Sequence, residues 1–386
     1  MITFLILRNQ KPNEFIRKLD TEDSNIMRIL IDIGHPGHVH LFRPFAERMI
    51  KSGNEILFTC REKEAETSLL KAYGFQYIVF GKHYNGVFGK LIGLVKYDIK
   101  MLKTALKFKP NVFLSHGSVY AAHAAFFLSK INIAMEDTGN KEQVVLYKPF
   151  TKYILTPSVF PNMYGKKQIK YNGYHELAYL HPKRFTPDKT ILRELCIKEN
   201  EKYVILRFVS WNASHDFGHT GISLENKIKV VQEFSKYAKV FISAEGELPI
   251  ELKKYKISIA PHRMHDAIAY SSLLYGESST MAEEAAMLGV PSVYLFNKGT
   301  IYTKHLENEY DIMYNFSESE EDQLKSIEKG LEILLMEGIN EDWQKKRVKM
   351  LSEKIDVTAF LVWFIENYPK SVNVMKENPD YQYNFK

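Results

Sequence analysis

The feature that most constrains the fold is a repeated alternation of short apolar runs with segments of helical period. At least five of these strand–helix alternations precede Tyr171, and four follow it. Strands that alternate with helices pair in parallel, since the helix carries the chain back to the start of the next strand. The pattern predicts an α/β protein with two doubly wound parallel sheets. A length of 386 residues also suits two domains.

Breaks in this alternation predict the domain limits. Gly173, Pro182 and Pro187 punctuate a connection where the chain is expected to pass between domains. Met27 opens the first strand and is the expected start of the folded protein. After the second domain a strongly apolar helix is expected to cross back onto the first, ahead of a disordered tail. We predict an extension at residues 1–26, a first domain at 27–172 and a second domain at 173–355. A cross-over helix at 356–368 and a tail at 369–386 follow.

Composition excludes several classes of protein. A hydrophobic fraction of 45% and a charged fraction of 25% are ordinary for a soluble globular chain. No apolar run approaches the ~20 residues of a membrane span, and the start of the chain does not resemble a targeting peptide. Two cysteines, Cys60 and Cys196, are too few for a disulfide framework or a thiolate metal cluster. The protein is therefore expected in the cytoplasm, a reducing compartment.

The charge is unevenly distributed along the chain. The net charge is +6, but residues 27–170 carry 21 basic and 10 acidic side chains, a net +11. Such an excess indicates that the first domain meets something anionic, such as lipid headgroups or a phosphorylated substrate. Nucleic acid is not an expected partner.

Residues 82–109 concentrate this positive charge. Seven lysines face a single acid, Asp98, with apolar residues between them, which predicts a long amphipathic helix. One interpretation is a core-packing helix with a solvated lysine face. The other is peripheral contact with an anionic membrane, at the inner face of the plasma membrane.

The first loop, Gly34–His40, holds two glycines, a proline and three histidines. The glycines and the proline predict a tight turn at the end of a strand, where ligands bind in a doubly wound sheet. Nothing supplies a carboxylate at fixed spacing from these histidines, so we expect no metal site there. A histidine with a near-neutral pKa is instead suited to proton transfer, and His38 is the candidate.

Two later strand ends should open on the same crevice. His116-Gly117-Ser118 follows one predicted strand, and Glu136-Asp137 follows the next. A carboxylate near a histidine can provide general-base catalysis, which makes His116 and Glu136 catalytic candidates. The alternative is that these residues only form hydrogen-bonded turns.

The stretch Tyr275–Leu295 carries the strongest binding pattern. Its turn places three hydroxyl residues, Ser278, Ser279 and Thr280, at the start of a helix. Free N–H groups there favour a phosphate or diphosphate. Glu284, one turn further on, can accept hydrogen bonds from a sugar diol. The alternative is an ordinary helix N-cap with a solvated glutamate.

This stretch resembles the nucleotide-sugar signature of the GT-B glycosyltransferases and of the UDP-N-acetylglucosamine 2-epimerases, which share a plan of two Rossmann-like domains. In those families a glutamate seven residues before the proline of a Leu-Gly-x-Pro-like segment meets the donor ribose. Glu284 and Pro291 have that spacing here, with Leu288 and Gly289 between them. The resemblance implies that Ser278–Thr280 meet the donor diphosphate and that Glu284 meets the ribose.

The first domain has a counterpart to this signature. Gly34, Gly37 and His38 match the Gly-x-x-Gly-His loop of the peptidoglycan N-acetylglucosaminyltransferase family, which lines the cleft between domains. His38 is then expected to touch the acceptor or the donor phosphates. Gly117 and Glu136 follow the order of motifs in these families, where a glycine-rich turn and a later glutamate face the acceptor or the sugar.

The resemblance also separates the two activities. The epimerases carry His-Gly-Asp, and this chain has Ser118 in place of the aspartate. After the strand Val204–Val209 it also lacks the His-Arg-x-Glu-Asn of the epimerases. Both departures favour transfer over epimerisation. The resemblance further implies that Arg207 and His215 lie beside the donor diphosphate. It also implies that main-chain groups around Arg263 and Met264 contact the nucleotide base.

These resemblances together define an expected function. From about Met27 to Tyr368 the chain looks closest to an uncharacterised prokaryotic family of GT-B-like proteins. It is expected to transfer sugar from a nucleotide sugar, UDP-linked, to a glycan or lipid-linked acceptor in cell-surface polysaccharide or glycolipid synthesis. No Asp-x-Asp motif stands where a metal would hold a diphosphate, so neither a metal nor a cofactor is expected. The alternatives are a UDP-sugar 2-epimerase or hydrolase-like enzyme and a non-catalytic GT-B-like binding protein.

Overall fold

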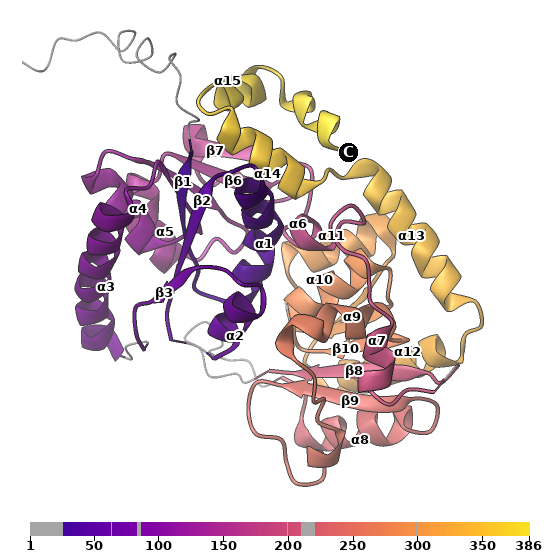
Figure 1. The fold of residues 1–386 in the computed structure, drawn as a ribbon. Coiled ribbons are helices and arrows are strands. Elements are labelled where there is room, and N and C mark those ends of the chain that lie inside the picture. Colours follow the sequence, from indigo (N-terminus) through magenta and orange to yellow (C-terminus); the bar gives the residue numbers. More distant parts are fainter. Residues whose placement is uncertain (1–25, 63, 83–85, 199, 210–220, 298) are drawn as a thin grey trace, which may run out of the picture.

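The computed structural model describes residues 26–386, except 63, 83–85, 199, 210–220 and 298. Its strands form two parallel sheets, one in each half of the chain, as Figure 1 shows. The predicted α/β class with two doubly wound parallel sheets is confirmed. The strand orders are β3-β2-β1-β4-β5-β6-β7 and β12-β11-β10-β8-β9.

The strands have the following bounds. The first sheet comprises β1 (Arg28–Asp32), β2 (Glu55–Cys60), β3 (Tyr77–Val79), β4 (Val112–His116), β5 (Ile131–Met135), β6 (Tyr153–Pro157) and β7 (Gln168–Tyr171). The second comprises β8 (Tyr203–Phe208), β9 (Lys239–Ala244), β10 (Leu273–Gly276), β11 (Ser292–Leu295) and β12 (Tyr314–Phe316).

Helices cover both faces of the first sheet, which explains why its strands are continuously apolar. In β1 the side chains of Ile29 and Ile31 join the core beneath α1, whereas Leu30 joins the core beneath α3 and α4. This alternation follows from the two-residue period of a strand. The helices of this half are α1 (Pro36–Lys51), α2 (Glu64–Ala72), α3 (Gly86–Phe108), α4 (Val119–Phe127) and α5 (Lys141–Tyr147).

The second half begins with a crossing segment that carries α6 and α7. Helix α10 of the second half ends at Gly289. This glycine takes the left-handed conformation (φ 72°) expected where a glycine stops a helix. The helices are α6 (Leu177–Leu180), α7 (Thr190–Glu194), α8 (Leu224–Phe234), α9 (Met264–Ala269), α10 (Ser279–Leu288), α11 (Ile301–Tyr310), α12 (Glu320–Leu335) and α13 (Ile339–Glu353).

The C-terminal segment returns to the first half of the molecule. Helix α14 (Val357–Glu366) packs against α1 and α6, and the N–H of Ile355 donates to Asn172 O at 3.0 Å. Figure 1 shows this return, in yellow, across the top of the first sheet. The division of the chain between residues 172 and 173 stays a prediction. Among the helices that the structure describes, none combines the length and apolar character needed to cross a bilayer.

The predicted disorder of residues 369–386 is wrong. Helix α15 (Lys370–Glu377) and a 3-10 helix (Pro379–Phe385) form there. Trp363 anchors them, because its ring lies 4.8 Å from that of Tyr381 and 5.3 Å from that of Phe385. The aromatic residues of the tail therefore find partners on the cross-over helix.

Candidate functional site

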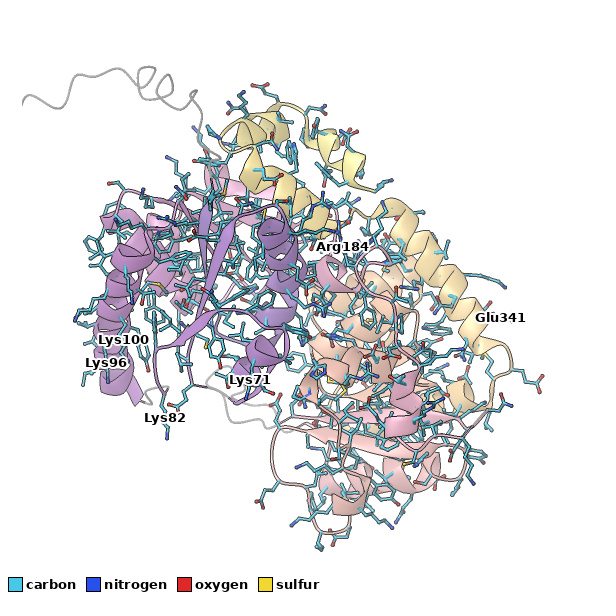
Figure 2. The ribbon with its side chains drawn as sticks, viewed as in Figure 1. Lys71, Lys82, Lys96, Lys100, Arg184 and Glu341 are labelled. Atoms are coloured by element: carbon cyan, nitrogen blue, oxygen red, sulfur yellow. The ribbon has the colours of Figure 1, made fainter. Side chains whose placement is uncertain are left out.

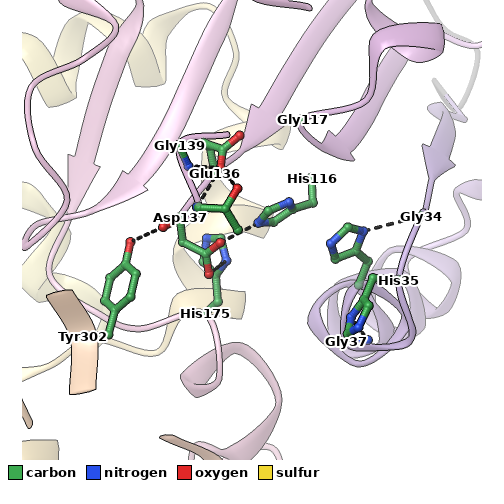
Figure 3. A network of polar contacts seen from close by, with 12 residues as sticks. Gly34, His35, Gly37, His116, Gly117, Glu136, Asp137, Gly139, His175 and Tyr302 are labelled. Carbon is green, nitrogen blue, oxygen red and sulfur yellow. Dashed lines mark hydrogen bonds and ion pairs between the residues drawn. The ribbon is translucent and has the colours of Figure 1, made fainter. Parts of the chain in front are cut away.

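The loops that follow β1, β4 and β5 meet at the carboxyl edge of the first sheet, as parallel strand order requires. His38 and His116 stack there with ring centroids 4.3 Å apart. Figure 3 shows His116 between the loop that carries Glu136 and Asp137 and the first loop at Gly34. The structure thus brings together the first-domain residues that the sequence selected.

His38 is held as a neutral imidazole. The N–H of Gly34 donates to its Nδ1 at 3.2 Å, so the proton of the neutral ring belongs on Nε2. Burial lowers the pKa of His38 well below its usual value, and the neighbouring His116 and His35 lower it further. Because Nδ1 is engaged, this arrangement makes His38 a hydrogen-bond donor rather than a free base. His35 caps helix α1, accepting from Gly37 N at 3.1 Å.

His116 forms one end of a bridge through Asp137 to His175. Its Nε2 lies 2.8 Å from Oδ1 of Asp137, and Nδ1 of His175 lies 2.9 Å from the other carboxylate oxygen. Burial alone would lower the pKa of His116, but the charge of Asp137 and its hydrogen bond raise that pKa to about 9. Although burial opposes ionisation, the charges of His175 and His116 hold the pKa of Asp137 well below its usual value. The first-domain site therefore carries an imidazolium paired with a carboxylate at neutral pH.

Asp137 and His175 were not among the selected candidates. Asp137 directly follows Glu136, so the signal was present at the same strand end. His175 lies in the crossing segment after β7, and nothing in its local sequence indicates that it returns to His116. The rings of His116 and His175 are T-shaped with centroids 5.3 Å apart, so the tertiary fold brings these two residues together.

Glu136 is buried and fully engaged in its own turn. Its Oε1 accepts from the N–H and hydroxyl of Thr138, both at 2.7 Å, and from Gly139 N at 3.0 Å. Its Oε2 accepts from the hydroxyl of Tyr147 at 2.6 Å. A Cβ added at Gly117 would lie 2.9 Å from this Oε2, which explains the glycine. The carboxylate that reaches the histidines is Asp137, while Glu136 holds the loop.

Ser118, which replaces the aspartate of the epimerase motif, has two structural roles. Its side chain caps α4 by accepting from Ala121 N at 3.2 Å. Its hydroxyl also donates to Oδ2 of Asp32 at 2.5 Å. Asp32 is buried beneath Gly34 and pairs with Arg61 at 2.9 Å. The serine therefore joins a buried polar network that supports the first loop.

On the second sheet, the turn between β10 and α10 is the predicted diphosphate site. Ser278 caps α10 by accepting from Met281 N at 3.4 Å, so its N-cap interpretation is confirmed. Ser279 and Thr280 form the first turn of that helix and are partly exposed. Gly276 takes φ 149°, and a Cβ there would meet the carbonyl oxygen of Arg207 at 2.0 Å. Only glycine lets β10 lie this close to β8 before the helix starts.

Glu284 is buried rather than solvated, and two side chains that the sequence did not indicate hold it. The hydroxyl of Tyr179 donates to its Oε1 at 2.8 Å, and Nε2 of His265 lies 2.9 Å from the same oxygen. His265 in turn contacts the ring of His40 at 4.5 Å between centroids. The predicted ribose ligand thus lies where α10, α6 and α9 meet, and His265 connects it to α1.

The remaining donor candidates are placed as follows. Arg207 donates to Ser243 Oγ at 3.0 Å and to Glu245 Oε1 at 2.6 Å, at the carboxyl ends of β8 and β9. The side chain of Arg263 is committed to ion pairs with Asp188, Glu194 and Asp266. Met264 opens α9, and His215 lies outside the described residues.

The two halves of the site are joined directly. Tyr302 of α11 donates its hydroxyl to the carbonyl of Asp137 at 3.1 Å, as Figure 3 shows. Glu176 and Glu283 lie beside this junction. Burial and nearby Asp137 raise the pKa of Glu176 to about 8. Burial, with Glu176 next, raises the pKa of Glu283 well above its usual value. Two protonated carboxyl groups therefore line the boundary between the sheets at neutral pH.

Two Rossmann-like halves, each with a parallel sheet, together with the C-terminal helix that returns to the first half, have the architecture of the GT-B fold. Solved structures with this fold include UDP-N-acetylglucosamine 2-epimerases and glycosyltransferases. The structure titled S. aureus MnaA–UDP co-structure aligns with a TM-score of 0.64 over 90% of this chain and 98% of that chain, at 12% sequence identity. At that identity the likeness concerns the fold alone.

The chain belongs to the family described as protein of unknown function DUF354, whose model matches residues 27–362. An uncharacterised protein of Methanocaldococcus jannaschii is 27% identical over 279 residues, which is 69% of this chain and 80% of the relative. A UDP-N-acetylglucosamine–N-acetylmuramyl-(pentapeptide) pyrophosphoryl-undecaprenol N-acetylglucosamine transferase of Wigglesworthia glossinidia brevipalpis is 28% identical over 248 residues, 58% of this chain and 66% of the relative.

Proposed function

We propose that this protein is a glycosyltransferase that takes sugar from a nucleotide sugar, UDP-linked, and needs no metal ion to hold the donor diphosphate. The observation that carries the proposal is the position of Glu284. It follows a capped helix start at the edge of the second sheet and is held by Tyr179 of the crossing segment and by His265, whose ring contacts His40 of the first domain. One relative is named as an N-acetylglucosamine transferase, and one structural neighbour was solved with UDP. Both support a nucleotide sugar as the substrate.

The donor side would work through α10. The N–H groups and hydroxyls of Ser278–Thr280 would meet the diphosphate, because a helix start carries partial positive charge. Glu284 has one oxygen occupied by Tyr179 and His265, which leaves the other to accept from the ribose. Arg207 and His215 are proposed beside the diphosphate, and the main chain at Arg263 and Met264 beside the base.

The first-domain histidines would handle the reacting centre. Nε2 of His38, carrying its proton, would donate to an acceptor or phosphate oxygen. The positive charge of His116 would stabilise negative charge that develops as the diphosphate departs. Glu136 would support both by holding the loop that presents Asp137.

Helix α3 supports a lipid-linked acceptor at an anionic membrane. Tyr97, Met101 and Ala105 face the core, so the core-packing interpretation holds for part of the helix. Yet five large apolar side chains are between 49% and 61% exposed on the same helix: Leu91, Ile92, Val95, Ile99 and Leu106. Lys96 and Lys100 lie among them, on the outer side of the first domain in Figure 2. We propose that this surface contacts the cytoplasmic face of the membrane.

Vesicle binding tests the membrane contact. Anionic vesicles should co-sediment the protein more than zwitterionic ones, and the double change Ile92→Glu with Val95→Glu should abolish this. Ile250→Glu is the matched control, because Ile250 is 74% exposed on the second domain. Equal binding by both variants would contradict the assignment of α3.

Nucleotide binding tests the central proposal. In a thermal-shift panel of nucleotides and nucleotide sugars, a ligand at 100 times its dissociation constant should add about 2.7 kcal/mol of stability. Glu284→Ala should weaken binding by about 1–3 kcal/mol, the scale of hydrogen bonds to a charged group. Glu341→Ala, on the exposed outer helix α13 (Figure 2), should leave binding unchanged. If no nucleotide or nucleotide sugar stabilises the folded protein, a non-catalytic binding protein becomes the favoured interpretation.

A 2-epimerase-like or hydrolase-like enzyme is the second candidate. Epimerases of the same fold, and the retained His116, Gly117 and Glu136, favour it. Ser118 argues against it, since its hydroxyl is committed to Asp32. Incubation of a bound UDP-sugar without acceptor distinguishes the two: sugar epimerisation or release at a rate comparable to transfer would overturn the transferase proposal.

A further inference from the structure

The proposed transfer uses the positive charge of His116 but does not explain why two histidines flank Asp137; an ion bound between them would supply that charge in place of a protonated His116. His116 comes from the end of β4, Asp137 from the loop after β5, and His175 from the crossing segment after β7. One potential ligand atom from each residue lies within 4.8 Å of those of the other two. Figure 3 shows both rings directed at the same carboxylate.

We propose that His116, Asp137 and His175 form a binding site for one divalent transition-metal ion of the zinc or cobalt kind. Two imidazoles and a carboxylate are ligands that such ions prefer. Tetrahedral coordination with metal–ligand bonds of about 2.0–2.2 Å holds neighbouring ligand atoms about 3.4 Å apart. The observed separations of 2.8 and 2.9 Å between nitrogen and carboxylate oxygen are about 0.5 Å shorter, so the three side chains would move apart slightly as the ion entered.

The surroundings favour a cation over an empty pocket. The side chains of His116 and His175 are only 9% and 6% exposed, and Glu136 adds a second carboxylate close by. The ring nitrogen of His175 that would bind the ion is Nδ1, which faces Asp137 at 2.9 Å, while its buried Nε2 has no hydrogen-bond partner among the described residues. Tyr302 fixes the Asp137 backbone through its carbonyl, which limits the reorganisation that binding would require.

The inference goes beyond the proposed donor chemistry. The diphosphate is assigned to the start of α10, so this ion would not hold the donor. It would instead tie the crossing segment to the first sheet. Three protein ligands also leave a coordination position for an oxygen from the cleft, as in catalytic rather than structural zinc sites. Magnesium and calcium are excluded, because they select oxygen ligands.

Titration of metal-free protein with Co²⁺ and Zn²⁺ tests the site. We expect one equivalent to bind, a visible Co²⁺ absorption band typical of nitrogen and carboxylate ligation, and no response to Mg²⁺. Asp137→Asn and His175→Ala should each raise the dissociation constant at least tenfold. His123→Ala is the matched control, since Nδ1 of His123 lies 2.9 Å from Oδ2 of Asp98 without a second histidine. That variant should bind as the wild type does.

Two results would overturn the proposal. One is the absence of saturable binding, which would leave the three residues as a hydrogen-bonded bridge. The other is binding that survives both ligand substitutions in protein shown to be folded by circular dichroism. If Asp137→Asn does not fold, His175→Ala and the wild-type Co²⁺ spectrum still decide the question. The nucleotide panel does not depend on this ion, so its outcome is independent.

Discussion

The two domains present the same local turn for different purposes. In each, a buried strand ends, a glycine follows, and a serine caps the next helix: Gly117 and Ser118 before α4, Gly276 and Ser278 before α10. The first turn lies within charged networks, with Ser118 bound to Asp32 and Gly117 packed on Glu136. The second turn has a partly exposed helix start and a backbone that touches the neighbouring strand.

The difference shows that one strand–turn–helix unit can either pack against buried charged side chains or present a helix start that can bind a ligand. Around the first turn, buried acids and histidines satisfy one another, which fixes protonation states. At the second turn Glu277 is satisfied by Lys227 and by main-chain N–H groups, but the hydroxyl residues Ser279 and Thr280 of the helix start are partly exposed, so a phosphate is the natural complement there. Stability should therefore depend on electrostatics at the first turn and on backbone sterics at the second.

Replacement of the two glycines should separate these effects most strongly. Gly276→Ala forces a Cβ to within 2.0 Å of the Arg207 carbonyl and should cost more than 4 kcal/mol, the range of severe backbone or packing clashes. Gly117→Ala, with side chains rather than backbone in contact, should cost about 1–3 kcal/mol. Urea unfolding measures both. Gly53→Ala is the control, because its Cβ would meet nothing and only a positive φ is strained. Equal costs at Gly276 and Gly117 would contradict the comparison.

The pH dependence of stability should come from the first turn. The pKa of His116 is raised to about 9, so its contribution is complete below its unfolded value of ~6.5 and is lost as pH rises through 9. A raised pKa at Glu176, to about 8, adds a loss of the same sign. In metal-free buffer His116 alone should lower the free energy of unfolding by about 3 kcal/mol between pH 6.5 and 9.5, and the loss from Glu176 adds to this. His116→Asn should flatten this slope; an unchanged slope would refute the assignment.

The two capping serines should differ in cost by a smaller amount. Ser278→Ala loses one N-cap bond and should cost about 1 kcal/mol. Ser118→Ala also removes the bond to the buried Asp32 carboxylate and should cost about 2–3 kcal/mol. Chemical denaturation of the two variants side by side gives the comparison. If Ser278 proved the costlier site, the polar network at the first turn would be weaker than its geometry indicates.

The smallest expected effect concerns the link from the crossing segment to α10. Tyr179→Phe removes one hydrogen bond to Glu284 and should weaken nucleotide binding by about 0.5–1.5 kcal/mol. Calorimetric titration measures the change. Tyr270→Phe, whose hydroxyl donates to Pro187 O, is the control and should bind normally. An effect larger than that of Glu284→Ala would show that Tyr179 itself contacts the ligand.

Local sequence patterns were sufficient for the elements and most turns. Strand–helix alternation predicted both sheets, because a helix between strands leaves parallel pairing as the simple solution. The sequence likewise predicted the long helix α3 from its helical period. The cap at Ser278 and the stop at Gly289 depend on residues within one turn. The apolar residues of 356–368 also predicted a helix there, and the resemblance to GT-B proteins predicted that it crosses back onto the first domain. These features depend on neighbours in sequence, which is why they could be read from it.

Other features depended on partners distant in sequence. The aromatic tail was expected to be disordered because its partner, Trp363, lies on a separate helix. The apolar residues of α3 were compatible with burial or exposure, since a helical period does not say how much of the surface a neighbouring helix covers. Glu284 was predicted to bind the ribose, with a solvated glutamate as the alternative, and it is buried because α6 and α9 bring Tyr179 and His265 to it.

The sequence by itself determined that this chain folds into two parallel-sheet domains with polar turns at their strand ends, because those signals are periodic and local. Only the tertiary structure decided which polar residues meet. The sequence considered a metal only at the first-loop histidines, whereas sheet order places β4 beside β5 and the crossing segment brings His175 to the same carboxylate as His116. Strand order and crossing geometry follow from the packing of the whole core, so no local pattern contains the cluster of His116, Asp137 and His175.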